Sequence, residues 1–143
     1  IYYPDKISLE EILKVFWESH DPTQGDRQGP DMGTQYRSAI FYYNDNQKKI
    51  VESSAKAYQK ELNDNKKAHG LDRSKITTEI GKLDVFYYAH DAHQQYLCMS
   101  KNPNGYCSLK GTGVSCPMPK RKKKDKNVAP QVNADDEHKN QAE

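Results

Sequence analysis

The strongest structural signal in this sequence is a capped helix with one apolar face, which begins at Ser8 and ends near residues 20–22. Ser8 is a good N-cap residue, and Glu11 follows three positions later, which is the spacing of a capping box. Because Asp21 precedes a proline, the α conformation is disfavoured there and the helix must end nearby. Large side chains recur at the spacing of a single helical face, which any fold must bury: Leu9, Ile12, Leu13, Phe16 and Trp17.

Weaker signals predict further elements along the chain. Glycine and proline make residues 22–35 a loop, and a β-prone run follows at 36–43. Asn44 and Asp45 can cap a second helix over about 46–67, with Gly70 just beyond its end. A narrow apolar stripe marks the buried side of this helix: Val51, Ala55, Tyr58 and Leu62.

The second half of the chain is less regular. Residues 76–80 alternate as a short half-buried strand, and a short helix is expected around 90–98 after an aromatic run at 86–88. From residue 102 onward glycine and proline dominate and no period survives. No apolar run approaches the roughly 20 residues that a membrane helix needs, so no membrane association is expected.

The composition changes at the C-terminal end. The last 27 residues hold seven basic and five acidic side chains, only six hydrophobic residues and no tyrosine. Such a segment buries too little surface to offset its ordering entropy. We therefore predict one domain over residues 1–117 and a disordered tail over 118–143, which carries a basic run at 120–126. Since the chain begins with Ile1 and with strand-like residues, we expect it to be a fragment.

The three cysteines are candidates for thiol chemistry. Cys107 and Cys116 have eight residues between them on a glycine-rich loop, so they can approach disulfide distance. Such an exposed bridge is expected to be labile, and Lys110 between the two cysteines favours a thiolate. Two unrelated surface thiols remain an equally weighted alternative. Zinc binding by Cys98, Cys107, Cys116 and His93 is disfavoured, because short ligand pairs are missing.

A second polar group lies at the predicted junction of loop and strand. The hydroxyl of Tyr36 and the carboxylate of Asp31 can converge there on a polarised oxygen of a substrate. Taken as residue types alone, Tyr36 is more typical of a core aromatic and Asp31 of a turn.

Longer motifs around Tyr36 and Asp31 favour a functional role for these two residues. The segments 20–24, 27–29, 33–40, 93–97, 101–107 and 111–117, together with Asp31, resemble the type A peptide methionine sulfoxide reductases in order and spacing. These segments read His-Asp-Pro-Thr-Gln, Arg-Gln-Gly, Gly-Thr-Gln-Tyr-Arg-Ser-Ala-Ile, His-Gln-Gln-Tyr-Leu, Lys-Asn-Pro-Asn-Gly-Tyr-Cys and Gly-Thr-Gly-Val-Ser-Cys-Pro.

The resemblance implies an α+β fold with a mixed sheet and flanking helices, and reduction of the S-epimer of methionine sulfoxide in proteins or as the free amino acid. A cysteine thiolate attacks the sulfoxide sulfur in that family, and two further cysteines pass the disulfide on to thioredoxin or dithiothreitol. Cys107 would resolve the oxidised cysteine by forming a disulfide with it, and Cys116 would relay that disulfide onward. Both lie within a loop over 102–117. Tyr36 and Asp31 would hold the sulfoxide oxygen. No bound cofactor or metal is implied, and a monomer is expected.

The departures from the family pattern are equally informative. The Gly-Cys-Phe-Trp motif that carries the family's attacking cysteine does not occur in these 143 residues, and Val15 precedes Phe16-Trp17 instead. Ser108 and Lys110 replace glycines of the recycling loop. We therefore expect the chain to be inactive alone, with apolar surface such as that of Trp17 left uncovered.

Two hypotheses follow from these departures. The chain is either the C-terminal portion of a working reductase, or a non-catalytic fragment or isoform that binds partners through its basic tail. The basic run suggests nucleic acid only weakly, and a solvated tail is the simpler interpretation. The compartment is not determined by the sequence; cytoplasm is favoured, and the basic run is compatible with the nucleus.

Overall fold

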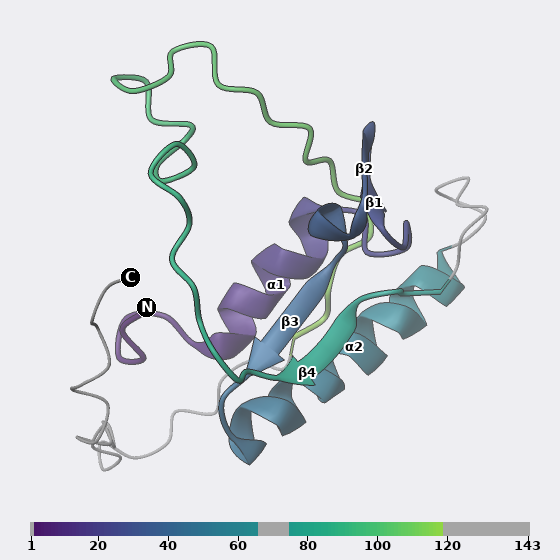
Figure 1. Cartoon of the computed structure of the whole chain (residues 1–143). Coiled ribbons are helices and arrows are strands. Elements are labelled where there is room, and N and C mark those ends of the chain that lie inside the picture. The colour runs from purple at the N-terminus through teal and green to yellow at the C-terminus, as the bar shows by residue number, and fades with distance from the viewer. Residues whose placement is uncertain (1, 66–74, 119–143) are drawn as a thin grey trace.

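The computed structural model describes residues 2–65 and 75–118 (Figure 1). Parallel pairing joins β3 (Ala39–Tyr42) to β4 (Glu79–Lys82), with Ile40 opposite Ile80, and antiparallel pairing joins the short strands β1 (Arg27–Gln28) and β2 (Asp31–Met32). Both kinds of pairing thus accompany two helices, which confirms the predicted α+β fold. The elements follow in the order α1 (Leu9–Ser19), β1 (Arg27–Gln28), β2 (Asp31–Met32), the 3-10 helix η1 (Thr34–Tyr36), β3 (Ala39–Tyr42), α2 (Asp45–Asp64) and β4 (Glu79–Lys82).

Helix α1 forms as its sequence predicts. The Ser8 hydroxyl accepts a hydrogen bond from the Glu11 backbone N–H at 3.2 Å, and the Ser8 backbone N–H donates to the Glu11 carboxylate at 2.8 Å. This pair of bonds is the capping box. Leu13 and Trp17 are buried on the apolar face, so the helix is anchored at its middle and near its end.

Helix α2 covers that face. The Asn44 side chain caps it by accepting from the Gln47 backbone N–H at 2.9 Å. The Trp17 ring stacks on the Tyr58 ring with centroids 5.3 Å apart, and the Trp17 indole N–H donates to the Ser54 hydroxyl at 3.0 Å. Trp17 is 0% exposed, so the expectation that its surface would be uncovered is wrong: α2 supplies the missing partner.

The ends of α2 and of the strands differ from the sequence prediction. Helix α2 ends at Asp64, where the Asn65 backbone N–H donates to the Glu61 carbonyl; Gly70 lies outside the described residues. The predicted strand over 36–43 is shortened to β3, because residues 34–36 form η1 instead. The predicted strand over 76–80 pairs only from Glu79, since the Thr77 backbone N–H donates to the Pro22 carbonyl at 2.8 Å.

Residues 84–107 make a long excursion away from the helices and the β3–β4 sheet (Figure 1). The helix predicted around 90–98 is wrong: this stretch contains hydrogen-bonded turns, such as the one from the His93 N–H to the His90 carbonyl at 2.7 Å. Residues 84–101 are all exposed, so no apolar face is buried here that could hold a helix of this length together.

The chain returns to the core after the excursion. Val114 and Cys116 are buried in the same cluster as Leu13 and Trp17, and Met118 packs against it. The predicted tail over 118–143 therefore starts at a residue in contact with the core. Its remainder, including the basic run, lies outside the described residues, so the predicted disorder stays a prediction. Within the described ranges, neither helix is long and apolar enough to span a bilayer.

His20 connects the end of α1 to the residues that directly precede β3 and β4. Its Nδ1 lies 2.6 Å from the Phe16 carbonyl oxygen and its Nε2 lies 2.7 Å from the Ser38 hydroxyl. The Ser38 hydroxyl also lies 2.8 Å from the Thr78 hydroxyl. A carbonyl can only accept, so Nδ1 carries a proton, and in the neutral ring Nε2 then accepts from the Ser38 hydroxyl. Burial favours this neutral form of His20, because it lowers the pKa of the ring.

This arrangement predicts an acid-sensitive fold. Burial lowers the pKa of His20 below its ordinary value of 6.5, so the unfolded chain takes up a proton before the folded one does. The free energy of unfolding should fall with decreasing pH below about 6.5, with a slope of at most about 1.4 kcal/mol per pH unit from this residue. Urea unfolding at several pH values measures it. His20→Gln should remove this slope and His93→Gln, at an exposed position, should retain it; equal slopes in all three proteins would contradict the assignment.

Candidate functional site

A cavity of about 380 Å³ lies where the end of α1, the loop over 21–38 and residues 108–109 meet. Asp31 and Tyr36, the two candidates from the loop–strand junction, both line it. The sequence-predicted pair is therefore brought to one cavity. The full lining consists of Phe16, Ser19, His20, Gln28, Asp31, Gln35, Tyr36, Arg37, Ser38, Ala39, Ser108 and Leu109.

A set of polar contacts fixes the loop that begins this wall. The Asp21 carboxylate accepts from the Thr23 backbone N–H at 3.0 Å and from the Gln24 side-chain amide at 2.8 Å. The Gln28 side chain bonds both backbone groups of Asp21, accepting from its N–H at 3.0 Å and donating to its carbonyl at 2.9 Å. The Asp21 and Gln28 side chains thus supply partners for backbone groups that a loop would leave unpaired.

Tyr36 is a partly exposed residue of the cavity lining. It ends η1, whose first turn is closed by the Tyr36 N–H donating to the Gly33 carbonyl at 3.0 Å. Gly33 has a φ of 137°, a conformation that favours glycine and that sets the direction of this turn. The Tyr36 side chain is 42% exposed, so it is not the satisfied core aromatic that its residue type alone suggests.

Asp31 connects this wall to the segment that carries Cys107. The Ser108 hydroxyl donates to the Asp31 carboxylate at 2.6 Å. Gly29 has a φ of 59°, and a Cβ built on it would lie 3.6 Å from the Ser108 carbonyl oxygen. The loop and residue 108 therefore lie against each other. Sequence reasoning identified Ser108 only as a replacement for a glycine, because its partner is 77 residues away.

The two candidate cysteines have different surroundings. Cys107 is exposed and Cys116 is 2% exposed, and both thiols are free. Burial, with a further contribution from the Glu18 carboxylate, raises the pKa of the Cys116 thiol to about 11. The expectation of an exposed bridge is thus wrong for Cys116, and the cation that acts on it is Lys14 of α1 instead of Lys110. The Cys107–Cys116 pairing stays a prediction.

The third cysteine, Cys98, was considered above as a zinc ligand together with the other two. Cys98 is exposed, and hydrogen bonding to Ser100 lowers the pKa of its thiol. Among the described residues no group of three or more His, Cys, Asp or Glu side chains is placed to hold a metal ion.

Comparison with known proteins identifies the family. The model of the family "Peptide methionine sulfoxide reductase" matches residues 1–128. The mitochondrial peptide methionine sulfoxide reductase of Homo sapiens and the reductase MsrA of Rippkaea orientalis are each 58% identical over 118 residues. These alignments cover 82% of this chain and 47% and 51% of those proteins. The chain thus spans about half the length of the curated relatives it matches.

A solved structure gives the same result for the fold. The crystal structure of Mxr1 from Saccharomyces cerevisiae in reduced form superimposes with a TM-score of 0.53 at 35% identity, covering 76% of this chain and 56% of that one. The family model alone matches most of the chain. The chain therefore belongs to the peptide methionine sulfoxide reductase family.

Proposed function

We propose that this chain acts in the reduction of methionine S-sulfoxide, in oxidised proteins and as the free amino acid, and so in protein repair. Its part is to hold the sulfoxide oxygen and to regenerate the attacking cysteine. One observation carries the proposal beyond family membership: Asp31, Tyr36 and the residues that follow Cys107 line a single cavity. The substrate wall and the recycling segment thus meet in one place.

The wall formed by Tyr36 and Asp31 suits a sulfoxide oxygen. The S–O bond is strongly polarised, and negative charge remains on oxygen as a thiolate attacks the sulfur. Tyr36, half exposed at the cavity, supplies an O–H donor for this oxygen. Such a preorganised donor lowers the barrier most where it meets developing charge. Asp31 lines the same cavity and holds Ser108 in place by accepting a hydrogen bond from its hydroxyl.

In this proposal the cysteines react one after another, and each step passes the oxidation on to the next thiol. The attacking cysteine takes the sulfoxide oxygen, which gives methionine and a sulfenic acid. The Cys107 thiol condenses with that sulfenic acid, releasing water and forming a disulfide. Cys116 then exchanges into this disulfide, and the attacking cysteine leaves as a thiol. A dithiol reductant, thioredoxin or dithiothreitol, reduces the Cys107–Cys116 bond and is itself oxidised. No bound cofactor takes part, and the protein acts as a monomer.

The attacking cysteine itself is not among the residues of this chain that line the cavity. None of Cys98, Cys107 and Cys116 is a lining residue there, and no Gly-Cys-Phe-Trp motif occurs in the 143 residues. We propose that this family motif supplies the attacking thiol. A reaction that lacks a positioned nucleophile forfeits much of the barrier lowering that proximity provides.

The 143-residue chain alone should therefore fail to reduce methionine sulfoxide with dithiothreitol or thioredoxin. A version extended by a family segment that carries Gly-Cys-Phe-Trp should reduce the S-epimer. Chromatographic measurement of released methionine from each epimer tests both statements. Stereospecific turnover by the 143-residue chain alone would overturn the assignment of roles, because one of its own cysteines would then have to attack.

Tyr36→Phe in the extended version should lower kcat by roughly a hundredfold, since the donor to the oxygen is lost and the ring is kept. Tyr43→Phe is the matched control, because Tyr43 is an exposed tyrosine that does not line the cavity. Steady-state rates with free methionine sulfoxide measure the effect. Equal losses in the two variants would show that Tyr36 has no special role at the oxygen.

Cys107→Ser should separate the chemical step from recycling. Without a resolving thiol the extended version should release about one methionine per chain and then stop, because thioredoxin has no accessible disulfide to reduce. A quench-flow time course shows the burst. Cys98→Ser should turn over like the parent, and sustained thioredoxin-driven turnover by Cys107→Ser would contradict the resolving role.

A further inference from the structure

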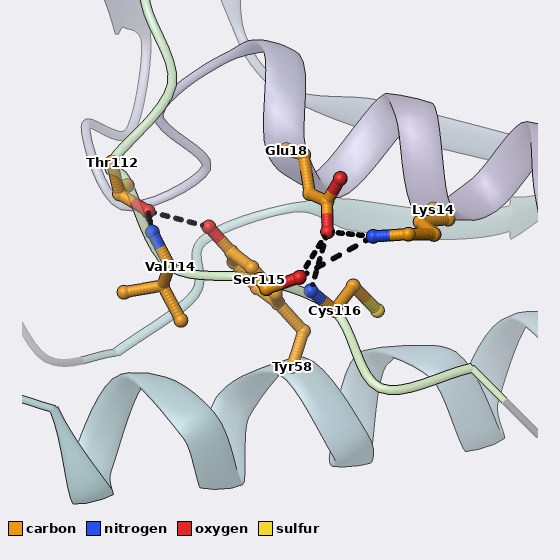
Figure 2. A network of polar contacts seen from close by, with 7 residues as sticks. All are labelled: Lys14, Glu18, Tyr58, Thr112, Val114, Ser115 and Cys116. Atoms are coloured by element: carbon orange, nitrogen blue, oxygen red, sulfur yellow. Dashed lines mark hydrogen bonds and ion pairs between the residues drawn. The ribbon is translucent and has the colours of Figure 1, made fainter.

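The segment over residues 111–116 is fastened to the last turn of α1 by one carboxylate (Figure 2). The same Glu18 oxygen accepts from the Ser115 hydroxyl at 2.7 Å and from the Cys116 backbone N–H at 2.8 Å. It also accepts from the Lys14 ammonium, which lies 3.3 Å from the Ser115 hydroxyl as well. Three donors from two segments thus converge on one oxygen, with sequence separations of up to 98 residues.

The start of the segment is held just as closely. A Cβ at Gly111 would overlap the Glu18 backbone carbonyl oxygen, so only glycine allows this approach. The Thr112 hydroxyl lies 2.6 Å from the Tyr58 hydroxyl and also accepts from the Val114 backbone N–H at 3.2 Å. The segment is therefore bound to α1 on one side and to α2 on the other.

This fastening places the sulfur of Cys116 out of reach. Cys116 is 2% exposed within the core cluster that includes Leu13, Trp17 and Leu62. Burial and the nearby carboxylate favour its neutral thiol, as the pKa of about 11 expresses. A buried, protonated thiol is a poor partner for disulfide exchange, which requires a thiolate with access to the disulfide.

We propose that Glu18 is a positioning residue for Cys116: its carboxylate keeps residues 111–116 docked, and the relay thiol becomes reactive only when this segment is released. The inference rests on the proposed function for the role of Cys116. On release, the Cys116 thiolate attacks a disulfide at the exposed Cys107. The new Cys107–Cys116 bond forms as the old S–S bond breaks, the departing thiolate takes a proton, and no further oxidant or reductant is needed.

Alkylation of the full chain by iodoacetamide, followed by mass mapping, tests the docking without requiring reductase activity. Cys116 should react far more slowly than Cys98 and Cys107. Glu18→Ala should speed its alkylation by about tenfold or more, since a charge-assisted acceptor is lost. Glu18→Gln, which keeps an acceptor oxygen, should lie close to the parent. Glu10→Ala is the matched control on the same helix, and it should leave the rate unchanged.

Trp17 fluorescence would reveal a loss of folding in Glu18→Ala. Ser115→Ala is a milder second variant that tests the docking in that case. It removes only the Ser115 hydroxyl, with its short bond to Glu18 and its longer one from Lys14, at an exposed residue, and should speed alkylation of Cys116 by about threefold. Parent-like protection of Cys116 in both Ser115→Ala and a folded Glu18→Ala would overturn the proposal. So would a Cys116 in the parent chain that reacts as fast as Cys98.

Oxidised glutathione extends the test to the exchange step. It converts exposed Cys107 into a mixed disulfide, releasing reduced glutathione, and Cys116 then displaces the second glutathione to form the Cys107–Cys116 bond. Glu18→Ala should close this bond about tenfold faster than the parent, and Glu18→Gln should not. If alkylation responds as expected but no Cys107–Cys116 bond forms in any variant, the relay role in the proposed function fails and the docking role of Glu18 stands.

Discussion

The stacking of Trp17 on Tyr58 is the contact on which the rest of this structure depends. It joins α1 to α2 with ring centroids 5.3 Å apart, and both rings are fully buried. The end of α1 can then form one wall of the cavity, through Phe16 and His20. The Tyr58 hydroxyl, at the edge of the same stack, meets Thr112 of the segment that contains Cys116. Hydrophobic burial therefore sets the positions of the groups that the proposed chemistry uses.

Local signals in the sequence were sufficient for the parts of the fold that local physics controls. The capping box at Ser8, the cap at Asn44 and the apolar stripes of both helices could be predicted, because each depends on residues within one or two turns. The helix expected around 90–98 does not form, since no other element packs on that stretch of the described structure. The start of β4 was misplaced because Thr77 bonds to Pro22, a partner 55 residues away.

The candidate site likewise contains residues that the sequence could identify and residues that it could not. Asp31 and Tyr36 could be selected because they stand in a long motif, and they share a cavity. Glu18 and Ser108 were not recognised as contacts of the cysteine segment, because both act across large sequence separations. The burial of Cys116 could not be inferred from a glycine-rich stretch, which by itself suggests exposure. Folding alone brings Cys116 to Glu18 in the last turn of α1, and Ser108 to Asp31.

The anchoring of Ser108 to Asp31 has a consequence for the reach of Cys116. When residues 111–116 are released, the chain remains tethered at residue 108, eight positions before the sulfur of Cys116. A short flexible tether gives its free end an effective local concentration in the millimolar range. That concentration favours attack within the same chain over attack by thiols of other molecules. The hydrogen bond from Ser108 thus fixes one end of this tether, and with it the neighbouring Cys107, beside Asp31.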